Sequence, residues 1–257
     1  MTAHNSPNPE DTAYTSSNPY TTEPTLDDNA GAHAIQRVVE GTLGAVGNGV
    51  ANTLAVGASL VLGSQVALRA GVWMQPRPMP HRQAALLEHP LRLRYRDVGA
   101  LLGEIGLVAG TDVADLGCGT GLFTLEMARR VGDTGQVHAV DIQQPMLDAA
   151  RHRVEAAGLG PRVRWYHSGM HTLPLPDESV EVALMAAVLG QLPARMLALD
   201  EVRRILRPGG RLAISEELPD PAYAPAPLVR RWAEQAGFRF GGLRGNPFCY
   251  TMLLFAG

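Results

Sequence analysis

The sequence predicts an α/β fold in which strands and helices alternate from about residue 111 to the end of the chain. Two observations predict it. Short apolar runs of strand length are separated by amphipathic segments of helix length, a pattern typical of parallel sheets. A turn with glycines at alternate positions, Gly117, Gly119 and Gly121, joins the apolar run that begins at Val113 to a helical pattern. Glycines allow such a tight turn and let a ligand approach bare main chain.

The strands follow from short apolar runs that end at turn residues. The strand that begins at Val113 is followed by expected strands at 136–141, 162–169, 179–188, 211–215, 238–243 and 248–255. The last two are separated by Arg-Gly-Asn-Pro at 244–247, which predicts a closing pair of strands. Arg207-Pro-Gly-Gly210 is expected to be a turn before the strand at 211–215.

The helices follow from periodicity and from their first residues. One is expected to begin at Leu122, directly after the glycine turn. A second is expected from Pro145 to Ala157, because proline is favoured in the first turn of a helix. Residues 196–206 place apolar side chains on one face and charged ones on the other, which predicts an amphipathic helix, and 228–236 predicts a short one.

Composition limits the classes of function. A chain of 257 residues with 46% hydrophobic content can form one α/β domain with additional segments. The formal charge of -3 gives no electrostatic reason to expect a nucleic-acid partner. Cys118 and Cys249 lack the spacing of a zinc site, so no metal is expected, and they favour a reducing, cytoplasmic location.

The first part of the chain predicts two segments. Residues 1–33 are rich in Pro, Asn, Thr and Ser and predict a disordered tail without a secretory signal. Residues 34–75 predict a Gly-rich apolar helix, and 42–68 carry no charge. That run is long enough to cross a bilayer, which takes roughly 20 residues, and the arginines that follow it would keep the rest of the chain cytoplasmic. Packing on the domain, pairing with a second copy, and disorder remain the alternatives.

Two motifs in combination resemble one family. Asp-Leu-Gly-Cys-Gly-Thr-Gly at 115–121 resembles motif I of the class I S-adenosyl-L-methionine (SAM) methyltransferases more than the dinucleotide pattern Gly-x-Gly-x-x-Gly. Leu-Arg-Pro-Gly-Gly-Arg-Leu at 206–212 resembles a late motif of the same family. The resemblance covers residues from about 81 to the end and is strongest to the ubiquinone/menaquinone-biosynthesis C-methyltransferase-like (type 11) branch. It implies a Rossmann-like sheet of seven strands, mostly parallel with the last antiparallel, and helices on both faces.

The resemblance implies where SAM binds. Asp115 and the glycine turn are expected to hold its methionine end. Asp141 follows the glycines by about 20 residues and ends a strand, where a carboxylate accepts both ribose hydroxyls. Met170 stands where the family usually has an acid that contacts adenine, so backbone groups of Met170 and His171 are expected to make that contact instead of a side chain. The expected cofactor residues are Asp115, Gly117, Cys118, Gly119, Thr120, Gly121, Asp141, Ile142, Met146, Gly169, Met170, His171 and Ala186.

Residues 76–110 are expected to form lid helices before the SAM-binding methyltransferase domain at 111–257, with a break near Pro90. By the resemblance, His81, Arg82, Tyr95 and Arg96 are candidates to face cofactor or substrate; a solvated arginine face is the alternative.

The expected reaction is direct displacement of the SAM methyl group by a small, apolar acceptor that is quinone-, lipid- or amine-like. The methyl group on the sulfonium of SAM is already activated for displacement, so few protein groups are needed and no catalytic residue is assigned. His171 and Glu216 are candidate proton acceptors, with structural roles as the alternative. Two other functions remain open. One is a non-catalytic SAM-fold module, tethered through 42–68. The other is an NAD(P)-dependent oxidoreductase, which the lack of a recognisable proton relay disfavours.

Overall fold

A computed structural model describes residues 36–37, 40, 52–53, 55–56, 59–60, 63–83, 97–218 and 220–257. The chain divides into two units, 1–60 and 61–257, and the second contains the sheet. The described residues of the first unit are helical, as are 63–74 in the second. The predicted tail at 1–33, the break near Pro90, and the lid candidates Tyr95 and Arg96 lie outside the described residues.

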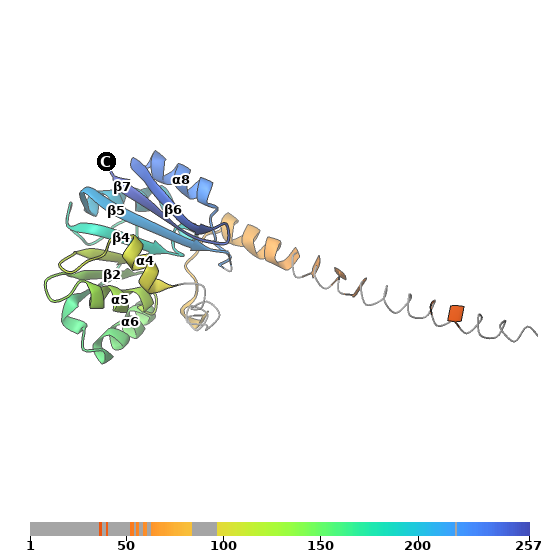
Figure 1. Ribbon diagram of the computed structural model, residues 1–257, viewed down its shortest axis with the longest axis horizontal. Helices are drawn as coiled ribbons and strands as arrows, with labels where there is room; N and C mark the ends of the chain where they lie inside the picture. Colours follow the sequence, from red (N-terminus) through yellow and green to blue (C-terminus); the bar gives the residue numbers. More distant parts are fainter. Residues whose placement is uncertain are drawn as a thin grey trace, which may run out of the picture. The chain divides into compact units, whose positions relative to one another are not determined.

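The second unit is built on a seven-stranded sheet with the order β3-β2-β1-β4-β5-β7-β6 (Figure 1). Neighbouring strands are parallel except that β7 runs antiparallel to both β5 and β6. The strands are β1 (Val113–Leu116), β2 (Val137–Asp141), β3 (Val163–His167), β4 (Val180–Ala186), β5 (Leu206–Glu217), β6 (Phe238–Asn246) and β7 (Cys249–Ala256). The predicted seven-stranded sheet with an antiparallel last strand is confirmed.

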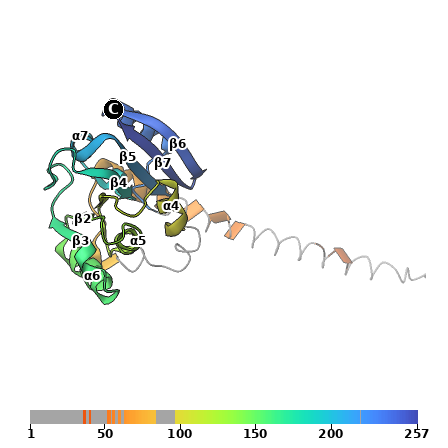
Figure 2. The same cartoon turned by 60° about the vertical axis from the view of Figure 1, so that its left-hand side comes forward.

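Helices cover both faces of this sheet (Figure 2). They are α4 (Val98–Glu104), α5 (Leu122–Arg130), α6 (Gln144–Ala156), α7 (Arg195–Ile205) and α8 (Ala226–Gln235), with short 3-10 helices η1 (His81–Gln83), η2 (Gly160–Arg162) and η3 (Leu189–Gln191). Successive residues of β1 point to opposite faces. Val113 packs in a cluster with α4, α5 and α6, whereas Ala114 and Leu116 pack with α7 and α8.

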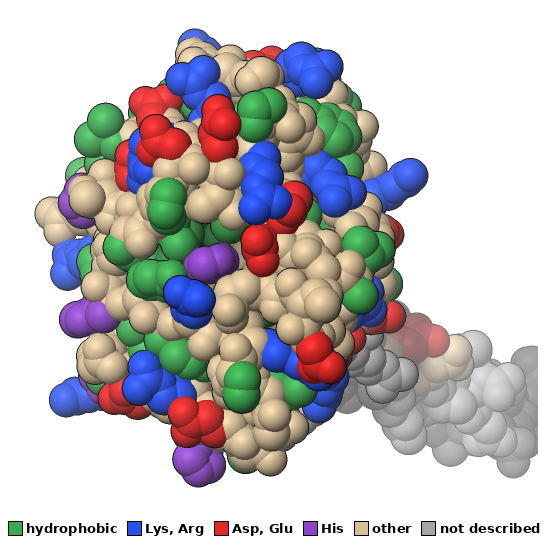
Figure 3. Space-filling model, turned by 90° about the vertical axis from the view of Figure 1, so that its left-hand side faces the viewer, with side chains coloured by type: hydrophobic (Ala, Val, Ile, Leu, Met, Phe, Trp, Pro, Cys, Tyr) green, Lys and Arg blue, Asp and Glu red, His purple; other side chains and the backbone are tan. Residues whose placement is uncertain are grey.

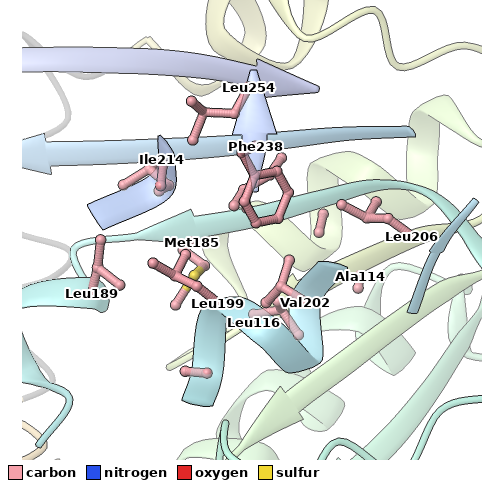
Figure 4. Packing of buried hydrophobic residues seen from close by; sticks show 14 of the residues in the cluster. Ala114, Leu116, Met185, Leu189, Leu199, Val202, Leu206, Ile214, Phe238 and Leu254 are labelled. Atoms are coloured by element: carbon pink, nitrogen blue, oxygen red, sulfur yellow. The ribbon is translucent and has the colours of Figure 1, made fainter. Parts of the chain in front are cut away.

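Both faces of the central strands are therefore core, which is why their sequences are continuous apolar runs. Figure 4 shows the second cluster: Leu199 and Val202 of α7 lie against Leu116 of β1 and Met185 of β4. All four side chains are fully buried. Complete burial of a leucine or methionine side chain contributes about 1.5–3 kcal/mol relative to exposure.

The strand order places the switch point of the sheet between β1 and β4. From β1 the chain adds β2 and β3 on one side, and then returns to add β4 and β5 on the other. The carboxyl ends of the strands at such a switch point are where open α/β sheets bind ligands.

Several predicted boundaries differ from the structure: β3 ends at His167 and not at residue 169, and β6 extends to Asn246 through residues expected as a turn. β5 begins at Leu206, so Arg207–Gly210, expected as a turn, belongs to the strand. Its pairing with β4 jumps from Val180–Leu206 to Val182–Arg211, which marks a bulge that accommodates the extra residues. β4 ends at Ala186 and not at Val188, because Ala187 has a φ of 57° and η3 follows directly.

The apolar segment at 42–68 falls largely outside the described residues. Across the parts of the chain that the structure does describe, no helix combines the length and the apolar character that crossing a membrane requires.

The close contact between the glycine turn and α6 predicts a position-specific loss of stability. A Cβ on Gly121, whose φ is 79°, would lie 2.8 Å from the Cα of Ala150. Gly121→Ala should lower the free energy of unfolding by about 2–5 kcal/mol, since a left-handed backbone and overpacking both contribute. Gly158→Ala is the matched control: its φ is 72°, with nothing within 4 Å of the added Cβ. It should lose only about 1–2 kcal/mol. Equal losses in urea denaturation would show that the packing argument is wrong.

Candidate active site

The glycine turn is held against the second strand by its backbone. The N–H groups of Gly117 and Cys118 both donate to the carbonyl of Val140, at 2.8 and 3.0 Å. Gly117, Gly119 and Gly121 have φ values of 80°, 53° and 79°. Only glycine adopts this region without strain, so the predicted need for glycines here has a geometric cause. α5 begins at Leu122, and its first N–H groups lack partners within the helix.

Crowding is a second reason for glycine. A Cβ on Gly117 would lie 2.5 Å from Cγ2 of Val188, which follows β4. The turn therefore fits between the end of β4 on one side and Ala150 of α6 on the other. Main chain, rather than side chains, forms the surface at this point of the sheet edge.

Asp115 is buried at the carboxyl end of β1, with a relative exposure of 2%. Its Oδ2 accepts a hydrogen bond of 2.5 Å from the hydroxyl of Thr124 in α5. The pKa of Asp115 is raised to about 7: burial raises it most, the hydrogen bond from Thr124 lowers it, and the nearby Asp141 raises it. The site thus contains a carboxyl group that titrates near neutrality.

Asp141 ends β2 and is joined directly to the glycine turn. Its Oδ2 accepts the N–H of Gly119 and its Oδ1 accepts the N–H of Gln143, both at 2.9 Å. Burial raises the pKa of Asp141, and these backbone hydrogen bonds oppose that shift. The carboxylate thereby fixes the turn relative to the neighbouring strand, a connection that sequence spacing alone does not reveal.

This pair of carboxyls fits the SAM that the fold family implies. Within the described ranges, neither Asp115 nor Asp141 forms an ion pair with an arginine or histidine, and burial raises both pKa values. A ligand with positive charge and hydroxyl donors would compensate both groups, and SAM has an ammonium, a sulfonium and a ribose diol. In the parts of the chain that are described, no group of three or more His, Cys, Asp or Glu residues is placed to hold a metal ion.

The expected adenine region lies beyond β2 and β3. Ile142 is 49% exposed next to Asp141, as a residue that packs on a flat ring would be. A Cβ on Gly169 would lie 3.0 Å from the ring of His171, so the missing side chain makes room for this exposed imidazole. The side chain of Met170 points elsewhere: it is 6% exposed and belongs to the core cluster under α7.

The remaining predicted cofactor residues lie around the turn. Cys118 is 7% exposed and packs in the core, and burial raises the pKa of its thiol far above the ordinary range, so it is no nucleophile. Thr120 and Met146 are buried. Ala186 is partly buried at the end of β4.

Glu216, the second candidate proton acceptor, is 1% exposed near the end of β5. One of its oxygens accepts the N–H of Ala224, at 3.3 Å. Ile214, two residues earlier on the same side of the strand, packs in the cluster of α7 and α8. Glu216 therefore faces these helices, whereas Asp115 lies on the face covered by α4, α5 and α6. The structure does not bring the two candidates, His171 and Glu216, into contact.

Two glutamines at the site were missed by the sequence analysis. Gln143 lies two residues after Asp141, and Gln191 ends η3, five residues after the end of β4. Both bind the backbone of Met79, through Gln143 Nε2 to the carbonyl and through Gln191 Oε1 to the N–H, each at 2.8 Å. His81 and Arg82 of η1 are exposed. A positional signal was present for Gln143 alone, because a polar residue shortly after a strand end lies at the ligand edge of the sheet.

Two hollows lie on the described surface away from this site. A hollow of about 380 Å³ lies at the amino ends of β2 and β3, lined by residues such as Gln136 and Arg162. Another of about 360 Å³ lies between α7 and α8, beside Trp232. The face in Figure 3 carries basic and acidic side chains interspersed, without a basic stripe that would suit a phosphate backbone.

Comparisons with known proteins agree with this geometry. Residues 113–210 match the family described as "Methyltransferase domain". A 2-phytyl-1,4-naphtoquinone methyltransferase of Trichormus variabilis is 36% identical over 109 residues, covering 42% of this chain and 48% of the relative. A ubiquinone/menaquinone biosynthesis C-methyltransferase of Hahella chejuensis is 36% identical over 115 residues, covering 45% and 46%. The chain thus spans about half the length of these curated relatives.

Solved structures agree as well. The crystal structure of a SAM dependent methyltransferase from Aquifex aeolicus has a TM-score of 0.66 and 28% sequence identity, covering 70% of this chain and 100% of that one. The sheet order, the glycine turn between two carboxyls and these likenesses agree on one class: the chain contains a class I SAM-dependent methyltransferase domain. Within that class its sequence is similar to the quinone C-methyltransferases. The oxidoreductase alternative is thereby set aside.

The raised pKa of Asp115 predicts a pH dependence of stability. Between its unfolded value of 3.8 and about 7, the native state binds a proton that the unfolded state does not. The ligand-free protein should therefore lose stability from this group as the pH rises from about 4 to 7, by up to about 1.4 kcal/mol per pH unit. Asp115→Asn should not show this loss, so the difference between the two unfolding free energies grows over that window and levels off above it. Parallel curves for wild type and variant would contradict the assignment.

Proposed function

We propose that this chain transfers the methyl group of SAM to a small, apolar, quinone-like acceptor. The observation that supports this most strongly is the connection between the glycine turn and Asp141. The N–H of Gly119 binds the carboxylate at the end of β2, so bare main chain and a diol acceptor are held 2.9 Å apart. In this proposal Asp115 and the turn receive the methionine end of SAM, and Asp141 receives its ribose.

The other cofactor residues have supporting roles in the proposal. Ile142 packs on one face of the adenine, and the backbone at Gly169, Met170 and His171 borders its edge. A backbone role for Met170 is consistent with a side chain that packs in the core. Cys118, Thr120 and Met146 shape the turn from beneath, because all three are buried.

SAM, when bound, supplies a methyl group that is already activated for displacement. The chain's own residues then have to hold the acceptor in line and keep water away. Correct orientation of two reactants contributes roughly 7–11 kcal/mol toward lowering a barrier in favourable cases. This accounts for a site with two cofactor carboxyls and no nucleophile of its own.

The acceptor side of the site is the carboxyl end of β4. Ala186 and Val188 are partly exposed there, Ala187 and Leu189 are buried beside them, and none of the four offers a side-chain hydrogen-bonding group. Such a surface favours an apolar ring over a polar amine or sugar. The names of the relatives from Trichormus variabilis and Hahella chejuensis, both quinone methyltransferases, support the same class of acceptor. We infer that a ring carbon of a reduced quinone is methylated.

A ring carbon becomes nucleophilic when a neighbouring hydroxyl loses its proton, so this acceptor needs a proton acceptor. His171 is the better placed of the two candidates for this role, because its exposed imidazole lies over Gly169 beside the proposed adenine region. Glu216 faces α7 and α8 and is bound by Ala224.

The domain organisation is part of the proposal. A tail at 1–33 and a Gly-rich apolar helix at 34–75 precede lid helices at 76–110 and the methyltransferase domain at 111–257. The uncharged run at 42–68 is proposed to contact a membrane surface or a second copy, on the cytoplasmic side. An apolar acceptor partitions into membranes, which gives such an attachment a purpose.

Asp141→Asn should weaken SAM binding. A hydrogen bond to a carboxylate is stronger than one to a neutral amide, so the loss should be roughly 10- to 100-fold in Kd, measured by calorimetry. Asp148→Asn serves as the control, because Asp148 is exposed on α6 and accepts from Gln144 one turn earlier. It should leave Kd unchanged. Unchanged affinity in Asp141→Asn would count against the ribose assignment.

The acceptor class is tested by mass spectrometry with SAM that carries a deuterated methyl group. A reduced naphthoquinone lacking its ring methyl should gain one labelled methyl on carbon, faster than a matched hydroxyl-blocked quinone or an alkyl amine. SAM binding without transfer to any of these would support the non-catalytic module instead.

A further inference from the structure

We propose that Gln143 and Gln191 are a pair of positioning residues that hold residues 75–83, the strap, closed over the cofactor site. In sheet order β1 lies between β2 and β4. A segment bound at the carboxyl ends of both β2 and β4 must therefore pass over the end of β1, where the glycine turn begins. The inference rests on the proposed function, because it concerns access to the same site.

The first anchor is on the β2 side. The Gln143 side chain binds the strap twice: its Nε2 donates to the carbonyl of Met79 at 2.8 Å, and its Oε1 accepts the N–H of His81 at 3.1 Å. Its backbone N–H donates to Asp141. One residue thus connects the strap to the carboxylate that is proposed to bind ribose.

The second anchor is on the β4 side. Gln191 Oε1 accepts the N–H of Met79 at 2.8 Å. Its Nε2 donates to the carbonyl of Ala187 at 2.8 Å and to the carboxylate of Asp220 at 3.3 Å. Ala187 is one of two described non-glycine residues with positive φ, so Gln191 also binds a strained peptide group at the proposed acceptor edge.

The two anchors act on a single residue of the strap. Met79 has its N–H bound from one side of the site and its carbonyl from the other, and it lies between Pro78 and Pro80, which restrict its backbone. A side-chain amide can both donate and accept, which a carboxylate or an ammonium cannot, so glutamine suits both positions. The strap contributes only backbone groups to these hydrogen bonds, so they do not restrict which side chains the strap carries.

A strap held in this way has a kinetic consequence for ligands. Ligand bound beneath it leaves only after the hydrogen bonds to Met79 open. Loss of either anchor should therefore raise the dissociation rate of S-adenosylhomocysteine. It should change the thermal stability of the domain little, because the strap is separate from the hydrophobic core. Ordering the strap also excludes water from the reacting groups.

The test compares Gln143→Met and Gln191→Met with Gln144→Met. Gln144 is the neighbour of Gln143 in sequence, but its Nε2 donates to exposed Asp148 on its own helix. Stopped-flow displacement should show S-adenosylhomocysteine leaving roughly tenfold faster from the first two variants, which each lose hydrogen bonds to the strap, and at the wild-type rate from Gln144→Met. Wild-type rates in both anchor variants would overturn the proposal.

A substitution in the strap itself tests the same contact without changing any residue of the sheet or its loops. Met79→Pro removes the N–H that Gln191 binds and leaves every sheet residue intact. It should reproduce the faster dissociation of Gln191→Met, and trypsin should cleave after Arg82 faster than in wild type. A normal dissociation rate with normal trypsin resistance would overturn the inference. If wild type itself binds no S-adenosylhomocysteine, the proposed function fails instead, and the trypsin comparison alone tests the strap.

Discussion

The structure depends on one constraint: a stretch of bare main chain has to lie between two buried carboxyl groups. The N–H of Gly119 binds Asp141, while Gly117 and Gly121 are too close to Val188 and Ala150 to carry side chains. Neither carboxyl forms an ion pair among the described residues, and burial raises both pKa values. In the absence of ligand this arrangement costs stability, and a cationic nucleoside would offset that cost. Binding and stability are therefore coupled through the same two groups.

The sheet provides this constraint with its geometry. Its order changes direction between β1 and β4, so the carboxyl ends of β1, β2 and β4 meet at one edge. Each end supplies a different kind of group: a titratable acid from β1, an acid fixed by two backbone N–H groups from β2, and apolar residues from β4. That division matches a ligand with a charged end, a diol and a reactive group that faces an apolar acceptor. The fold alone does not specify methyl transfer, but this distribution of groups favours it.

Much of the fold was predictable because its signals are local. Apolar runs, the glycine turn and an amphipathic helix each follow from neighbouring residues, and the two motifs carried the strand order through their resemblance to a family. The start of β5 was not predictable from the sequence, because its pairing with β4 extends the strand through Arg207–Gly210 by means of a bulge. The glutamines were missed for a similar reason. Their partner, Met79, is 64 residues from Gln143 and 112 from Gln191, and no local pattern reports such a contact.

We propose that SAM binds with its positive charge against Asp115. The most direct test is calorimetric titration with SAM at pH 6 in two buffers that differ in ionisation enthalpy, which counts the protons released on binding. With a pKa of about 7 in the free protein, Asp115 is mostly protonated at that pH, so the account predicts release of about one proton per SAM bound. Asp115→Asn should release none. Tight binding of SAM by the wild type without proton release would contradict the account.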